Sequence, residues 1–85
     1  MTEKGKGTPG GPSQTSDELR KTITQRELEC LDWTARGKTS WETSIILEIS
    51  ENTVNFHLKN ALRKLDANNK CHAIAKAMAR GIVRL

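Results

Sequence analysis

The chain has 85 residues, a size typical of one small domain, and its net charge of +4 suits an acidic partner such as nucleic acid. Its two cysteines are far apart and lack the short ligand spacing of zinc sites, so we expect reduced thiols, no metal and a cytoplasmic location. No apolar run approaches the length of a transmembrane helix, and the N-terminus lacks the apolar stretch of a secretory signal, so we expect no membrane association.

The N-terminal segment, residues 1–20, is predicted to be a disordered tail or linker. It contains four of the six glycines and both prolines of the chain. A segment of this composition has too few apolar residues to offset the entropy lost on folding. The folded domain is therefore expected over residues 21–85.

A first helix is predicted to begin near Gln25. Thr24 and Glu27 have the spacing of a capping box, in which each side chain accepts a hydrogen bond from the backbone N–H of the other residue. Gly37 is expected to end the helix, because glycine readily adopts the left-handed conformation found after helix C-termini. The residues expected on the buried face are Cys30, Leu31 and Thr34, with Trp33 also in the core.

A second, short helix is predicted to follow a second capping box, formed by Thr39 and Glu42. It is expected to end near Leu47, with Ile46 and Leu47 as its apolar anchors. Residues 48–50 would form a turn before the next helix. A short helix, a tight turn and a longer helix are the pattern of a helix-turn-helix.

The third helix, predicted over residues 51–65 with Ser50 as its N-cap, has two different faces. One face is apolar and consists of Val54, Leu58, Ala61, Leu62 and Leu65. The other face combines amides, cations and an aromatic ring, and consists of Asn52, Asn55, Phe56, Lys59 and Arg63. Such groups can contact base edges, thymine methyl groups and phosphates. The alternative from this helix alone is an ordinary amphipathic helix with solvated charges.

A fourth helix is predicted over residues 70–80, with Asn69 as its N-cap and Gly81 as its stop. Ile82 would fold back against the helix end. The apolar stripe expected on this helix consists of Ile74, Ala77 and Met78. Four helices and no strand pattern predict an all-α domain.

Several motifs in a fixed order resemble the LuxR-type helix-turn-helix DNA-binding domain. They are Thr24-x-Arg26-Glu27, Trp33, Gly37-Lys38-Thr39-Ser40-Trp41-Glu42, Ile46-Leu47-x-Ile49-Ser50, Thr53-Val54-Asn55-Phe56-His57 and Lys64-Leu65. The pieces at residues 37–42 and 55–57 are similar to the quorum-sensing branch of that family. The resemblance implies that the third helix enters the major groove of double-stranded DNA and that the fourth helix pairs two copies. It also implies sequence-specific regulation of transcription.

The resemblance and the chemistry of the helix ends together suggest the functional residues. The expected base contacts are Asn55, Phe56, Lys59 and Arg63, with the amide on adenine, the ammonium on guanine and the phenyl ring on a thymine methyl group. The expected phosphate contacts are Lys38, Thr39, Ser40, Trp41 and Thr53, because N–H groups and hydroxyls at the start of a helix bind anions. The expected dimer face consists of Ala75, Lys76, Ala79 and Arg80.

Each of these assignments has a purely structural alternative. Lys59 and Arg63 could be ordinary solvated charges. Thr39 could serve only as a helix cap, and Trp41 could pack across the first helix. The face of the fourth helix could be solvated.

The family pattern is not followed everywhere, and the function has an alternative of another class. Thr43 and Ser44 stand where the family usually has Ile and Ala, which would put polar groups between the second and third helices. No signal-sensing domain is expected in this chain, which would be either an excised piece of a longer regulator or a naturally short protein. The second hypothesis is therefore a short interaction protein that pairs with a full-length regulator and inhibits it. An enzyme is not expected, since common catalytic and phosphate-loop motifs are missing, and neither is a cofactor.

Overall fold

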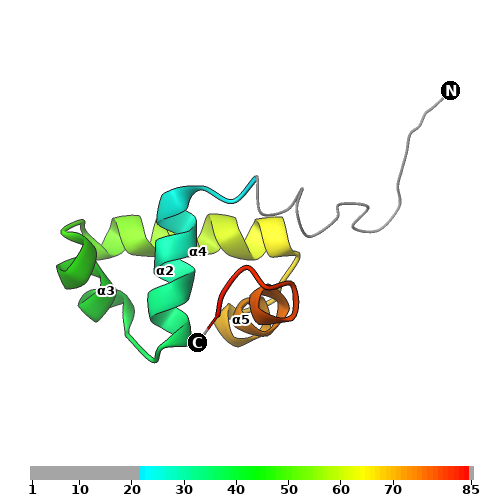
Figure 1. The fold of residues 1–85 in the computed structure, drawn as a ribbon. Helices are drawn as coiled ribbons and strands as arrows, with labels where there is room; N and C mark the ends of the chain where they lie inside the picture. Colours follow the sequence, from blue (N-terminus) through cyan, green and yellow to red (C-terminus); the bar gives the residue numbers. More distant parts are fainter. Residues whose placement is uncertain (1–21, 85) are drawn as a thin grey trace, which may run out of the picture.

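The computed structural model describes residues 22–84, so the predicted tail lies outside the described residues. These residues form four α-helices and no strand: α2 (Gln25–Ala35), α3 (Ser40–Leu47), α4 (Glu51–Leu65) and α5 (Lys70–Ala79). The all-α prediction is confirmed. Helix α4 packs against each of the other three, with α3 near one end and α5 near the other (Figure 1).

Both predicted capping boxes are present, which explains where α2 and α3 begin. The Thr24 hydroxyl accepts from the Glu27 N–H at 3.1 Å, and the Glu27 carboxylate accepts from the Thr24 N–H at 3.0 Å. Thr39 and Glu42 repeat this arrangement at 3.1 and 2.9 Å. Each N-cap hydrogen bond contributes about 1 kcal/mol to stability. The predicted Ser50 cap is also confirmed, as its hydroxyl accepts from the Thr53 N–H at 3.0 Å.

Left-handed residues end the helices and set the directions of the next ones. Gly37 after α2 has φ of +90° and Gly81 after α5 has φ of +71°, as the two stop predictions require. Within residues 22–84, two residues other than glycine also adopt this conformation, Glu48 after α3 with φ of +59° and Asp66 after α4 with φ of +55°. Glu48 therefore sets the tight turn of the helix-turn-helix.

The core is built around the apolar face of α4. The buried residues of α4 are Val54, Leu58, Ala61 and Leu65, and around them pack Cys30 and Leu31 of α2, Ala73 and Ala77 of α5, and Ile23, Ile82 and Val83. Ile82 folds back as predicted, with its N–H donating to the Ala77 carbonyl at 2.8 Å. Thr43 and Ser44 are buried as expected, and their hydroxyls donate to the Thr39 and Trp41 carbonyls at 2.8 and 2.6 Å.

Several of the residues predicted to be in the core lie at its edge or outside it. Ile46 is 40% exposed and Met78 is 43% exposed, while Trp33 is half-buried beneath the Arg36 guanidinium. Each of them sits about 100° around its helix from the centre of the buried face, because the helical period is 3.6 residues. On α3 the inward positions belong to Thr43, Ser44 and Leu47.

A partly buried ion pair, between Glu27 and Lys64, was not predicted from the sequence. Glu27 is 3% exposed, and its carboxylate accepts a hydrogen bond from the Lys64 ammonium at 2.8 Å. The same ammonium donates to the Thr22 carbonyl at 2.6 Å, so it joins the start of the described chain to the last turn of α4. Burial alone would raise the pKa of Glu27, but the bonds from Lys64 and from the Thr24 N–H hold it below its ordinary value.

Candidate nucleic-acid interface

The side of α4 opposite the core is exposed along its whole length. Its side chains are the five expected there, Asn52, Asn55, Phe56, Lys59 and Arg63, and we call this surface the front face of α4. Phe56 is 61% exposed, and its ring lies edge-to-face with the His57 ring, at 5.8 Å between centroids. An exposed phenyl ring of this kind is available to a partner.

The N-terminus of α3 lies directly beside the front face. The Ser40 hydroxyl donates to the Asn55 side-chain carbonyl at 2.7 Å, which joins the first residue of α3 to the second turn of α4. The residues predicted to contact phosphate and those predicted to contact bases are thus parts of one continuous surface. The sequence did not indicate this bond, because the two residues are 15 positions apart.

The other predicted phosphate contacts are placed around the same helix start. Lys38, Thr39 and Trp41 are exposed, and Trp41, at 61%, does not pack into the core. Thr39 is already engaged as the N-cap of α3. Thr53 is half-buried, and its hydroxyl lies 2.7 Å from that of Ser50, so it supports the cap of α4. Neither capping role prevents a further contact through the remaining lone pair of the hydroxyl.

The charge of this surface is positive and largely uncompensated. The salt bridges within residues 22–84 are Arg26–Glu29, Arg36–Asp32 and Lys64–Glu27, so Lys38, Lys59 and Arg63 have no carboxylate partner there. The nearby Glu42 carboxylate accepts from the Thr39 N–H, which lowers its pKa, and the positive charge of Lys38 lowers that pKa as well. Unpaired cations in such a cluster attract an anionic ligand.

Only part of the predicted dimer face of α5 is exposed. Ala75 and Ala79 are exposed and Arg80 is half-buried. Lys76 instead donates to the carbonyls of Leu65 and Asp66, at 3.2 and 2.8 Å, and so caps the C-terminus of α4 within the chain. This capping role was not predicted. Pairing through α5 stays a prediction.

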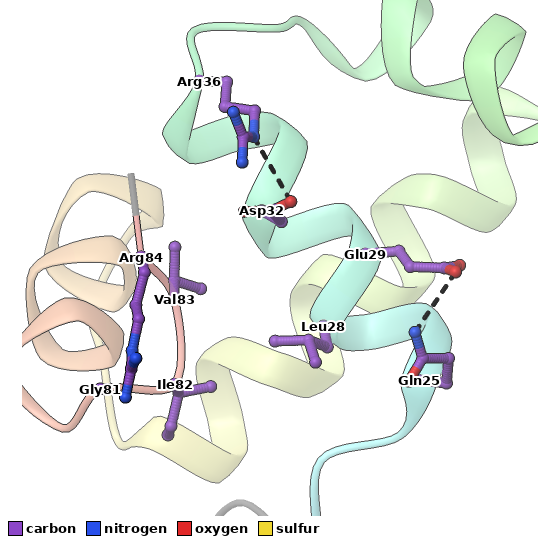
Figure 2. A pocket seen from close by; sticks show the side chains of 9 residues that line it. All are labelled: Gln25, Leu28, Glu29, Asp32, Arg36, Gly81, Ile82, Val83 and Arg84. Atoms are coloured by element: carbon purple, nitrogen blue, oxygen red, sulfur yellow. Dashed lines mark hydrogen bonds and ion pairs between the residues drawn. The ribbon is translucent and has the colours of Figure 1, made fainter.

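The pockets and titratable groups of the described residues do not offer an alternative site of comparable character. A pocket of about 560 Å³ lies between α2 and residues 81–84, and none of the predicted contact residues lines it (Figure 2).

Over residues 22–84, no group of three or more His, Cys, Asp or Glu could hold a metal ion. Cys30 is buried, which raises the pKa of its thiol, and Cys71 is exposed. No helix in that range is long and apolar enough for a membrane span.

Comparisons with known proteins identify the family. The model for bacterial regulatory proteins of the luxR family matches residues 21–77. The quorum sensing-dependent transcriptional regulator RpaR of Rhodopseudomonas palustris is 56% identical over 66 residues, which are 78% of this chain and 27% of that protein. The structure of the transcription factor GerE superposes with a TM-score of 0.70 at 32% identity, over 73% of this chain and 92% of GerE.

A second solved structure, SdiA of Escherichia coli, gives a TM-score of 0.69 at 50% identity, over 75% of this chain and 27% of SdiA. The chain spans about a quarter of the length of the curated relatives that it matches. The family model covers the helix-turn-helix and most of α5, the elements that build the surface described above. The chain belongs to the luxR family of bacterial regulatory proteins.

Proposed function

We propose that this chain is the sequence-specific, double-stranded DNA-binding domain of a transcription regulator, with α4 as its recognition helix. The observation that carries the proposal is the front face of α4. It presents an amide, a phenyl ring and two unpaired cations, at Asn55, Phe56, Lys59 and Arg63, on the side opposite the apolar face that packs into the core. A helix of this kind fits the major groove, where such groups distinguish the base pairs.

In this mechanism α3 and α4 have different roles. The start of α3, with Lys38 and the exposed Trp41, contacts phosphates and fixes the position of the domain on the duplex. The front face of α4 then reads the bases, and each good pairing is worth about 1–3 kcal/mol of discrimination. Release of counterions from the neutralised phosphates supplies much of the affinity, so binding weakens as salt rises.

The regulatory setting that we propose for this chain is inferred from the proteins that it resembles. RpaR is named as a quorum sensing-dependent transcriptional regulator, and the LuxR protein of Aliivibrio fischeri, 51% identical over 68 residues, as a transcriptional activator. We infer the same setting here: a non-enzymatic, cytoplasmic regulator, responsive to a cell-density signal and paired on DNA through α5. Two copies related by a two-fold axis would read two similar half-sites.

The test is selection of bound duplexes from random-sequence DNA by the whole chain, followed by measurement of Kd for the enriched duplex and a scrambled one. We expect an enriched motif with two similar half-sites. A variant with Ala at positions 55, 56, 59 and 63, its helicity checked by circular dichroism, should lose the preference. Equal binding of that variant would overturn the proposal. A chain that enriches no duplex but abolishes DNA binding by a longer family member would be an inhibitor.

A further inference from the structure

Ser40 stands at the junction of three helices. It is the first residue of α3, and its hydroxyl donates to the Asn55 side-chain carbonyl of α4 at 2.7 Å. The same oxygen accepts a hydrogen bond from the Lys70 ammonium, at the start of α5, at 3.3 Å. A chain of two hydrogen bonds therefore runs from α5 through α3 to the front face of α4.

The direction of these bonds fixes the orientation of the Asn55 amide. An ammonium can only donate, so Lys70 occupies a lone pair of the hydroxyl and leaves the hydroxyl hydrogen to point at Asn55. The positive charge of Lys70 also favours the carbonyl end of the amide on this side. Throughout the described part of the chain the Asn55 side-chain nitrogen has no hydrogen-bond partner, so its NH₂ group remains available to a base.

We infer that Ser40 is a positioning residue for base readout, which holds Asn55 so that its NH₂ group donates to an acceptor on a base edge, and that Lys70 holds Ser40. The inference rests on the proposed DNA binding and specifies how one of its base contacts is made. A side chain fixed before binding loses less rotamer entropy on contact and accepts fewer alternative bases. The role differs from a phosphate contact, which would add affinity without discrimination.

The test measures discrimination at one base pair. The base pair that Asn55 contacts is first identified as the position of the selected duplex at which the Asn55→Ala variant no longer prefers one base. At that position we compare Kd for a duplex with the base pair changed with Kd for the selected duplex. The ratio of the first Kd to the second should fall about fivefold in Ser40→Ala, as expected for one lost hydrogen bond. Lys70→Met should lower the ratio less, and Ser40→Thr, which keeps the hydroxyl, should restore it.

Two controls separate positioning from other roles. The double variant Ser40→Ala/Asn55→Ala should discriminate no less than Asn55→Ala alone, because both changes remove the same contact. Lys38→Met removes one positive charge, as Lys70→Met does, but lies outside the bond chain and should weaken all duplexes equally. A uniform loss of affinity in Ser40→Ala, with the ratio unchanged, would make Ser40 a phosphate contact and overturn the inference.

A measurement without DNA keeps the inference distinct from the proposed function. In the free chain, the order parameter of the Asn55 side-chain amide, from ¹⁵N relaxation, should fall in Ser40→Ala and return in Ser40→Thr. An unchanged order parameter in Ser40→Ala would refute the positioning role even if the chain binds DNA. Absence of specific duplex binding by the wild-type chain would refute the proposed function, whatever the order parameter shows.

Discussion

Lys59 is the residue on which the proposed readout can be tested most directly. It is exposed at the middle of the front face and has no carboxylate partner within residues 22–84. Lys59→Ala is expected to weaken binding to the selected duplex by about 1–3 kcal/mol and to relax the preference at one base position. The measurement is Kd for the selected duplex and for its single-base variants.

The matched control for Lys59 is Arg26, an exposed cation on α2 that pairs with Glu29 at 3.3 Å. Arg26→Ala also removes one positive charge, but it should leave the base preferences unchanged. If Lys59→Ala lowers affinity equally for every duplex, then Lys59 contacts phosphate and its assignment to a base is wrong.

At the scale of one element, the two faces of α4 should respond oppositely to truncation. Phe56 is 61% exposed and Leu58 is 2% exposed, although only one residue separates them in the sequence. Phe56→Ala should change the free energy of unfolding by less than about 0.5 kcal/mol while weakening DNA binding. Leu58→Ala should destabilise the domain by about 2–5 kcal/mol, because it leaves a cavity in the core. Denaturant unfolding and Kd measurements check both. Marked destabilisation by Phe56→Ala would mean that its ring packs against the domain.

The turn between α2 and α3 depends on Gly37, with φ of +90°. A Cβ at this position would meet no atom within 4 Å, so any cost of Gly37→Ala arises from the backbone conformation alone. We expect a loss of about 1 kcal/mol, since the left-handed penalty of alanine exceeds its entropic advantage in the unfolded chain. Gly37→Asn should cost less, because Asn tolerates this region. Equal unfolding midpoints for all three proteins would contradict this account.

The helices could be predicted because their start signals are local. Thr24, Thr39 and Ser50 each bond to a backbone N–H three residues away, so the starts of three helices are encoded in short windows. The inward face of α3 could not be predicted in this way. It is a helix of eight residues whose buried positions include Thr43 and Ser44, so hydrophobicity pointed to Ile46 instead.

At the scale of the whole molecule, the contacts that sequence reasoning missed are those between distant residues. The Lys64–Glu27 pair spans 37 positions, the Lys70–Ser40 bond 30 and the Lys76–Leu65 bond 11. In these three contacts a lysine reaches a group on another element, and in the Ser40–Asn55 bond, which was also missed, a hydroxyl does so. From sequence alone such a lysine is indistinguishable from a solvated one, since its pairing depends on how the helices pack. The exposed front face was predictable because it follows from helical periodicity within α4.

The Glu27–Lys64 pair gives the domain a pH dependence that can be derived from its geometry. The pKa of Glu27 in the folded state lies below its unfolded value, so the folded state favours the ionised carboxylate. The stabilisation is complete above the unfolded pKa of about 4.3 and is lost as the pH falls through the folded pKa. We expect the free energy of unfolding, from urea titrations, to decrease as the pH is lowered below about 5.

Glu27→Gln should flatten this decrease and cost about 1–3 kcal/mol of stability at pH 7, because it removes a charge-assisted hydrogen bond. Glu29→Gln, which alters only the exposed contacts with Arg26 and Gln25, should keep the decrease. A Glu27→Gln variant with the pH profile of the wild type would show that other carboxylates control the acid stability of the domain.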